Sequence, residues 1–115
     1  MAAPDFTPSR SPVVSMPDEI DVTNAGEVLN LITAACGPGV TAVIVDLTAT
    51  RFCDSGGLRH LLLAYGRVAA AGAQLRLAIP SDGPIGRVVE LTGINRQVAV
   101  YPTLELAIDG TRQPG

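Results

Sequence analysis

The strongest constraint on the fold is the nearly continuous apolar run at residues 40–47, which reads Val-Thr-Ala-Val-Ile-Val-Asp-Leu. A β-branched run of this kind is typical of a strand buried on both faces of a parallel sheet. It leads through a short polar segment to a turn at residues 53–57, after which apolar residues recur at helical spacing to about Ala70. The sequence therefore predicts a buried strand whose carboxyl end delivers a turn to the start of a long helix.

The patterns on either side of this strand alternate between helical and extended periodicity. Apolar residues at spacings of three and four predict a helix over 25–36, capped by Thr23 or Asn24 and ended by Gly37. The further predicted elements are strands at 12–16, 74–79 and 97–101, helices at 85–91 and 103–108, and a strand end or loop at 18–22. Alternating strands and helices predict an α/β fold with at least partly parallel pairing.

Length and composition predict one folded domain and limit the kinds of partner that it can bind. The chain has 115 residues, and we expect a domain at 13–109 between a flexible leader at 1–12 and a loose tail at 110–115. A net charge of -3 and an aromatic content of 3% argue against a nucleic-acid partner, because phosphate contacts need cations and base stacking needs aromatic rings. The leader lacks a secretory pattern and no apolar run reaches about 18 residues, so we expect a cytoplasmic protein without membrane insertion.

The turn before the long helix is the strongest candidate site. Ser55 is predicted to be the helix N-cap, and Gly56 and Gly57 leave the following amides uncovered by side chains. A helix start of this kind favours negative charge, including phosphate. Asp54 has two interpretations that the sequence leaves open: it meets a hydroxyl or cationic group of a partner, or it is simply stabilised by the helix dipole.

The cysteines and the one histidine allow few kinds of chemistry. Cys53 lies beside a helix start, which lowers a thiol pKa and makes it a candidate redox site, although Asp54 and burial oppose this. A Cys36–Cys53 disulfide is not expected, since the two positions lie roughly 20 Å apart along the strand between them. His60 has no second ligand at metal-binding spacing, so no metal or other cofactor is expected.

An enzyme that uses Cys53 or Ser55 as its nucleophile is the least supported function. The sequence has no Gly-x-Ser-x-Gly elbow, no Walker-type phosphate loop and no histidine placed as a partner base. We therefore expect a binding protein and not an enzyme.

Five motifs in order along the chain resemble STAS domains, and bacterial anti-sigma factor antagonists in particular. They are Ile-Asp-Val-Thr-Asn-Ala at 20–25, Val-Ile-Val-Asp-Leu at 43–47, Phe-Cys-Asp-Ser-Gly-Gly-Leu at 52–58, Val-Val-Glu-Leu-Thr-Gly-Ile at 88–94 and Tyr-Pro-Thr-Leu-Glu-Leu-Ala-Ile at 101–108. The resemblance covers about residues 13–108. It implies a central mixed sheet of four or five strands flanked by helices.

The resemblance also implies partner switching. The unmodified antagonist binds an anti-sigma factor, commonly a kinase of the GHKL type, and so frees a sigma factor. In phosphorylatable members the kinase modifies a serine in the turn Asp-Ser-Ser-Gly, usually the second. Aligning Asp54 and Gly57 with the ends of that turn puts Ser55 at the first serine and Gly56 at the second. Either Ser55 takes the phosphate instead, or the domain binds without this switch.

The expected contact surface combines the turn, the start of the long helix and an acidic segment. The helix at 25–36 starts near the end of the strand at 40–47, which brings the acidic segment close to the turn. The residues are Asp18, Glu19, Asp21, Asp54, Ser55, Gly56, Gly57 and Arg59. An alternative function is a STAS subunit of another assembly, such as a lipid- or sulfate-transport complex, and neighbouring genes would distinguish the two.

Overall fold

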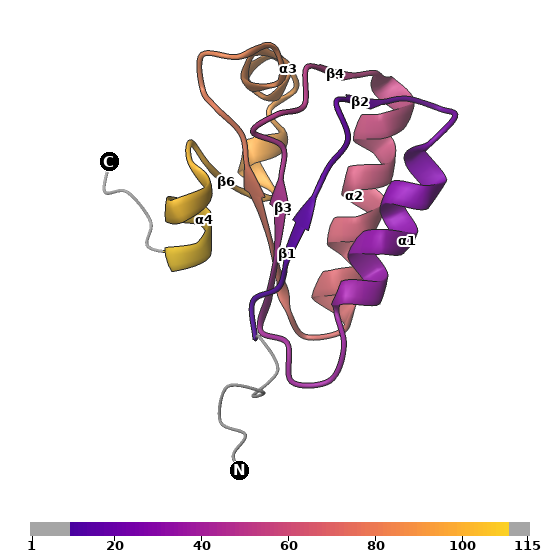
Figure 1. Cartoon of the computed structure of the whole chain (residues 1–115), viewed down its shortest axis with the longest axis vertical. Coiled ribbons are helices and arrows are strands. Elements are labelled where there is room, and N and C mark those ends of the chain that lie inside the picture. The colour runs from indigo at the N-terminus through magenta and orange to yellow at the C-terminus, as the bar shows by residue number, and fades with distance from the viewer. Residues whose placement is uncertain (1–9, 111–115) are drawn as a thin grey trace.

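The computed structural model describes residues 10–110 and has helices on both faces of a parallel sheet (Figure 1). The elements in chain order are β1 (Val13–Ser15), β2 (Glu19–Ile20), α1 (Ala25–Ala35), β3 (Ala42–Asp46), β4 (Phe52–Cys53), α2 (Ser55–Ala70), β5 (Gln74–Ala78), α3 (Pro84–Thr92), the 3-10 helix η2 (Ile94–Arg96), β6 (Ala99–Tyr101) and α4 (Leu104–Asp109). The α/β class and the alternation of strands and helices are confirmed.

The main sheet has four strands in the order β1-β3-β5-β6, and β2 and β4 form a second, two-stranded sheet. Every strand pairing within residues 10–110 is parallel. The number of strands in the main sheet is confirmed, and the described residues show parallel pairs where a mixed sheet was expected. The physical reason is that a helix separates each strand of the main sheet from the next, through α1, α2 and α3. Such crossover connections return the chain in the same direction.

The first strand is paired from residue 10 onward. The carbonyl of Arg10 accepts hydrogen bonds from the amides of Thr41 and Ala42, and the carbonyl of Pro12 accepts one from Ile44 at 2.9 Å. The end of the expected leader is therefore paired with the chain around β3. The rest of the leader, residues 1–9, and the tail at 111–115 lie outside the described residues.

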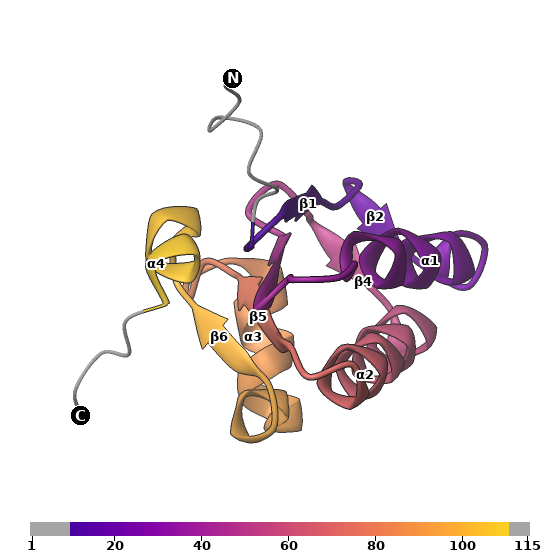
Figure 2. The same cartoon turned by 90° about the horizontal axis from the view of Figure 1, so that it is seen from below.

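The sheet separates two apolar cores of unequal size. The larger lies between the sheet and α1, α2 and α3, and the smaller lies under α4 on the opposite face (Figure 2). Val43 and Val45 of β3 point into the larger core and Ile44 into the smaller, and all three are fully buried. The buried central strand is thus confirmed. No helix of residues 10–110 is long and apolar enough to cross a bilayer.

Local capping residues mark ends of α1, α3 and α4. Asn24 is the N-cap residue of α1, although its side chain makes no capping bond there. Gly93 ends α3 with a positive φ of 72°, a conformation that favours glycine. Thr103 caps α4, since its hydroxyl oxygen accepts a hydrogen bond from the amide of Leu106 at 3.1 Å.

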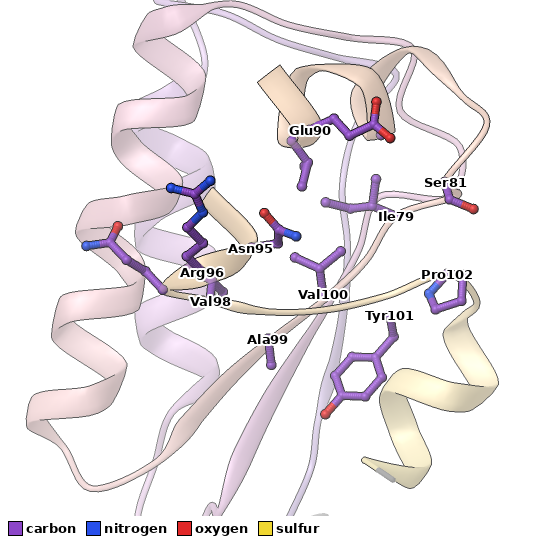
Figure 3. A pocket seen from close by; sticks show the side chains of 13 residues that line it. Ile79, Ser81, Glu90, Asn95, Arg96, Val98, Ala99, Val100, Tyr101 and Pro102 are labelled. Atoms are coloured by element: carbon purple, nitrogen blue, oxygen red, sulfur yellow. The ribbon is translucent and has the colours of Figure 1, made fainter. Parts of the chain in front are cut away.

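A pocket lies between α3 and β6, at the edge of the main sheet (Figure 3). Its walls are distinct from the turn at residues 54–57.

Candidate functional site

The small β2–β4 sheet holds the acidic segment against the turn. In its parallel register Glu19 lies opposite Phe52 and Ile20 opposite Cys53. The amide of Asp54 then donates to the carbonyl of Ile20 at 3.1 Å, so the pairing continues to the start of α2. The predicted proximity of the two segments is confirmed, and direct strand pairing is its physical cause.

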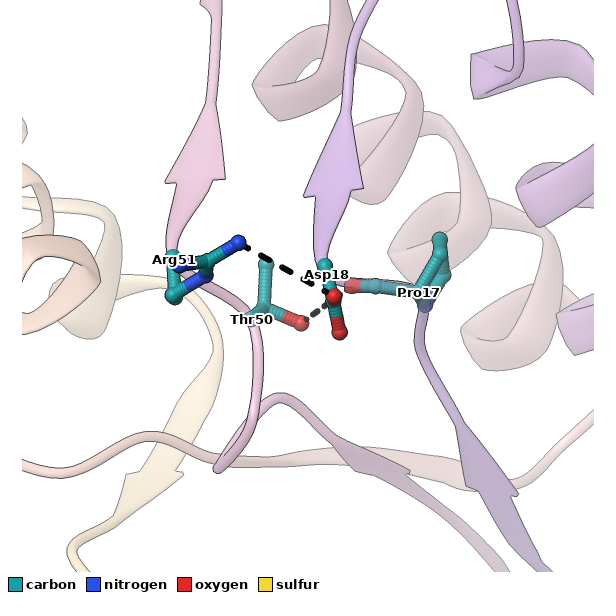
Figure 4. Close-up of polar contacts among 4 residues, drawn as sticks. All are labelled: Pro17, Asp18, Thr50 and Arg51. Atoms are coloured by element: carbon teal, nitrogen blue, oxygen red, sulfur yellow. Dashed lines mark hydrogen bonds and ion pairs between the residues drawn. The ribbon is translucent and has the colours of Figure 1, made fainter.

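Just before β2 and β4, a buried hydroxyl group and an exposed ion pair also join the two segments (Figure 4). The hydroxyl of Thr50, which is buried, donates to the carbonyl of Pro17 at 2.8 Å. Arg51 and Asp18 approach to 4.0 Å, but both side chains are more than 70% exposed and solvent screens the pair. Thr50 therefore contributes more than the ion pair to holding the strands together.

Asp54, and not Ser55, caps α2. The backbone of Asp54 is extended, with φ -83° and ψ -178°, and its Oδ1 accepts a hydrogen bond from the amide of Gly57 at 2.8 Å. Ser55 is the first residue of the helix and is exposed. The predicted N-cap is wrong by one position, because the carboxylate reaches the amide three residues on while Ser55 already has helical backbone. The carboxylate of Asp54 is itself the negative charge that is favoured at the start of the helix.

The two glycines of the turn have different roles. A Cβ on Gly57 would lie 2.8 Å from Cγ2 of Ile20 and 2.9 Å from both Sγ of Cys53 and the carbonyl oxygen of Ile20, so close packing of α2 on β2 requires glycine. A Cβ on Gly56 would meet Oδ1 of Asp54 at 3.4 Å and Cβ of Val22 at 3.8 Å, which leaves room for a small side chain. The turn therefore needs the second glycine and tolerates replacement of the first.

The surroundings of Cys53 disfavour the reactive thiolate form. Burial, followed by the nearby charge of Asp54, raises the pKa of its thiol to about 11. The thiol faces the carbonyl of Asp54 with a sulfur–oxygen distance of 3.6 Å. Burial and Asp54, the two influences expected to oppose a low thiol pKa, therefore outweigh the helix start. Cys36 and Cys53 are both free, as expected.

Polar side chains in the first turns of α2 contact the helix backbone or face solvent. His60 is half-buried, and its Nδ1 lies 2.8 Å from the carbonyl oxygen of Gly56 in the preceding helical turn. Arg59 is exposed beside it. Within residues 10–110 no group of three His, Cys, Asp or Glu side chains is placed to hold a metal ion.

The loop between β2 and α1 is tied to the acidic segment by Asn24. Its side-chain amide donates to the carbonyl of Glu19 at 2.8 Å, and its Oδ1 accepts from the amide of Asp21 at 2.9 Å. The carboxylate of Asp21 accepts hydrogen bonds from the hydroxyl and from the amide of Thr23. These bonds lower the pKa of Asp21, and the bond from the hydroxyl has the larger effect. This loop is therefore held in one conformation next to the turn.

Two apolar residues that the sequence analysis missed lie at this surface. Val22 is 77% exposed and adjoins Gly56, and Phe52 is 48% exposed on β4. In the sequence Val22 is a single apolar residue between polar neighbours. Its position next to the acidic segment was the one feature that could have indicated a role at this surface. We call the surface formed by the exposed and half-buried residues of 18–22, 51–56 and 59 the turn surface. Gly57, which was expected to belong to it, is buried.

Residues 6–107 match the family model described as STAS domain. The chain belongs to the STAS domain family. It is 27% identical to the anti-sigma-F factor antagonist RsfB of Mycobacterium tuberculosis, over 87% of this chain and 80% of that protein.

Solved structures of antagonists share the fold of this STAS domain. A crystal structure of an anti-sigma factor antagonist from Mycobacterium paratuberculosis has a TM-score of 0.69 at 30% identity, covering 88% of this chain and 85% of that one. The antagonist SpoIIAA in its unphosphorylated form has a TM-score of 0.66 at 23% identity, covering 89% and 90%. A STAS domain protein from Planctomyces limnophilus has a TM-score of 0.72 at 22% identity, covering 90% and 92%.

Proposed function

We propose that this STAS domain is an anti-sigma factor antagonist that binds an anti-sigma factor through the turn surface and so frees a sigma factor. The observation that carries the proposal is the direct pairing of the acidic segment with the strand that leads into the turn. It joins the two halves of the expected contact surface into one rigid platform. The relatives named as antagonists support the same conclusion.

The composition of the turn surface suits reversible protein binding. Val22 and Phe52 are exposed apolar anchors, and burying such a side chain against a partner contributes on the order of 1.5–3 kcal/mol. Asp18 and Glu19 on one side and Arg59 on the other are exposed charges at its margin. An apolar centre with a polar rim is the usual arrangement of a protein interface. The proposed role is binding, without catalysis or a cofactor.

Ser55 is the candidate phosphoacceptor at this surface. Its side chain is exposed in the first turn of α2, where the helix amides accommodate a phosphate. A phosphoryl group there would add roughly -1.5 to -2 charge beside Asp54 and block an apolar or acidic partner. With Gly56 at the usual acceptor position, the alternative is an antagonist that binds without phosphorylation control.

The test mixes the full chain with the anti-sigma factor encoded nearest to its gene, with and without ATP. Complex formation is followed by size-exclusion chromatography and modification by intact mass. We expect a complex in the absence of phosphorylation. A mass gain that disappears in Ser55→Ala would assign the acceptor, and a complex without mass gain would assign binding without the switch. No complex under any condition would overturn the proposed function.

A restored acceptor gives a second readout if the partner is a GHKL-type kinase. Gly56→Ser puts a serine at the position that phosphorylatable relatives use, and the structure has room for it. We expect this variant to gain one phosphate with ATP and to lose the complex, whereas Gly66→Ser in the middle of α2 gains none there. Gly66 has no neighbouring atom within 4 Å of an added Cβ, so it is a matched control.

A further inference from the structure

The pocket at the edge of the sheet is a groove that follows one strand along its whole length. Residues 95–102, which include all of β6, line it without a gap. The opposite wall comes from α3, through Gly86, Val89 and Glu90, and from Ser81 in the loop before it. Figure 3 labels Ser81 and Glu90. The groove holds about 500 Å³, within the range of pockets that bind small ligands or a few residues of a chain.

The backbone of β6 is available to a ligand at one residue. β6 is the outer strand of the sheet, and the carbonyl of Tyr101 accepts from the amide of Ile79 at 2.8 Å. Because polar groups alternate along a parallel strand, the N–H and C=O of Val100 point away from β5. The amide of Val98 is already bound to the carbonyl of Ile94 at 3.0 Å, and Pro102 has no N–H. An added strand can therefore pair fully at Val100, over a short segment.

The second wall of the groove is fixed in place. A Cβ on Gly86 would lie 2.4 Å from the carbonyl oxygen of Pro80 and 2.7 Å from that of Ser81, so α3 packs directly on the backbone before it. Ile85 and Val89 of α3 are buried in the larger core. The groove is thus preformed between a rigid helix and a strand edge, which lowers the entropy cost of binding.

The charges of the groove select the chemistry of its ligand. Arg96 and Glu90 line the groove without an ionic partner among residues 10–110. The salt bridge found in that range joins Arg51 and Asp18 instead. Arg96 and Asn95 offer donors at one end of the groove, and Ser81 and Pro102 lie at the other (Figure 3). An acidic side chain is favoured near Arg96 and disfavoured beside Glu90 on α3.

We propose that this groove binds a short extended peptide segment of a partner protein, which adds to the edge of β6 and carries an acidic side chain next to Arg96. The backbone pairing at Val100 supplies register, since strand addition uses main-chain hydrogen bonds for affinity and side-chain pockets for specificity. Ile79, Val89 and Val98 form the apolar floor for an aliphatic side chain. The site is separate from the turn surface and goes beyond the proposed antagonist function.

The test selects binders from a random peptide display library on the immobilised full-length chain. We expect enriched peptides with one acidic residue near aliphatic or β-branched residues. Their binding should shift the amide signals of residues 95–101 in a two-dimensional ¹H–¹⁵N NMR spectrum. Failure to enrich any peptide, or shifts centred on residues 18–22 and 51–59, would overturn the proposal.

Variants then test the two features that the proposal uses. Arg96→Glu, at an exposed position, should weaken the selected peptides at least fivefold, and Val100→Pro should weaken them at least tenfold by removing the edge N–H. Ser15→Pro is the matched control on the opposite edge strand β1 and should leave affinity within twofold. Equal affinity in Arg96→Glu would contradict the proposal even if Val100→Pro does not fold.

Discussion

At the scale of single residues, the start of α2 depends on the carboxylate of Asp54. Its bond to the amide of Gly57 satisfies one of the free N–H groups of the helix. We expect Asp54→Ala to lower the free energy of unfolding by about 1 kcal/mol, while Asp54→Asn keeps most of the cap. Urea denaturation measures this. Ser55→Ala is the control and should change the free energy of unfolding by less than about 0.5 kcal/mol. A larger loss in Ser55→Ala than in Asp54→Ala would show that Ser55 is the cap.

The thiol of Cys53 predicts a specific dependence of stability on pH. Its pKa rises from an ordinary value of 9.0 to about 11 in the folded protein. A raised thiol pKa stabilises the fold fully below pH 9, and the stabilisation is lost as the pH rises towards 11. The chain has no lysine, a residue whose ordinary pKa of about 10.4 falls in this window. We expect the free energy of unfolding to fall between pH 9 and 11, and to fall less in Cys53→Ala.

Alkylation supplies an independent check on Cys53. At pH 8 iodoacetamide should modify the half-buried Cys36 and leave the buried Cys53 largely intact, as peptide mass mapping would show. Preferential modification of Cys53 would contradict the raised pKa.

The residues of the turn surface were predictable from the sequence in part. The motif at 52–58 and the resemblance located the turn, because small and polar residues after an apolar strand mark such a junction. Which oxygen caps the helix could not be predicted, since Asp54 and Ser55 are adjacent and both are good N-cap residues. The pKa of Cys53 could not be predicted either, because its burial depends on how closely Gly57 lets α2 approach β2.

At the scale of elements, α4 packs on the smaller core, and a few polar contacts hold its C-terminal end. It is a six-residue helix with one buried residue, Ala107. The guanidinium of Arg76 on β5 donates to the carbonyls of Ala107 and Ile108 at 3.1 and 3.3 Å, and the hydroxyl of Tyr101 lies 3.4 Å from the carbonyl of Gly110. The C-terminal end of α4 is thus held by side chains of two strands.

Removing the guanidinium should loosen α4 alone. Charge-assisted hydrogen bonds contribute about 1.5–3 kcal/mol, so Arg76→Met should speed amide exchange at Ala107 and Gly110 by about tenfold or more. Hydrogen exchange followed by NMR measures this, with the amides of α2 as an internal reference. Arg67→Met, an exposed arginine on α2, is the control and should leave α4 unchanged. Faster exchange throughout the molecule would instead show a global loss of stability.

The elements themselves differ in how well local sequence predicts them. The helices and the central strand carry strong apolar periodicity and were predicted within a few residues. β2 and β4 are two residues long, and their pairing joins positions more than thirty residues apart, so no local pattern predicts it. The parallel direction of every described pair follows from the crossover helices, a property of the whole chain.

At the scale of the whole molecule, two surfaces lie on one rigid α/β frame. The turn surface has charged margins around Val22 and Phe52, and the groove beside β6 has a free strand edge. They share no residues. Fold and family were accessible from the sequence, whereas the groove was not, because it arises where α3 packs over the last strand.

The affinity of Ser55→Glu for the anti-sigma factor tests the central claim most directly. Ala69→Glu is the matched control, an exposed residue about 20 Å further along the same helix. Isothermal titration calorimetry should give a Kd for Ser55→Glu that is more than tenfold weaker than that of the unmodified chain, with Ala69→Glu within twofold of it. Unchanged affinity in Ser55→Glu, or equal loss in both variants, would contradict binding through the turn surface.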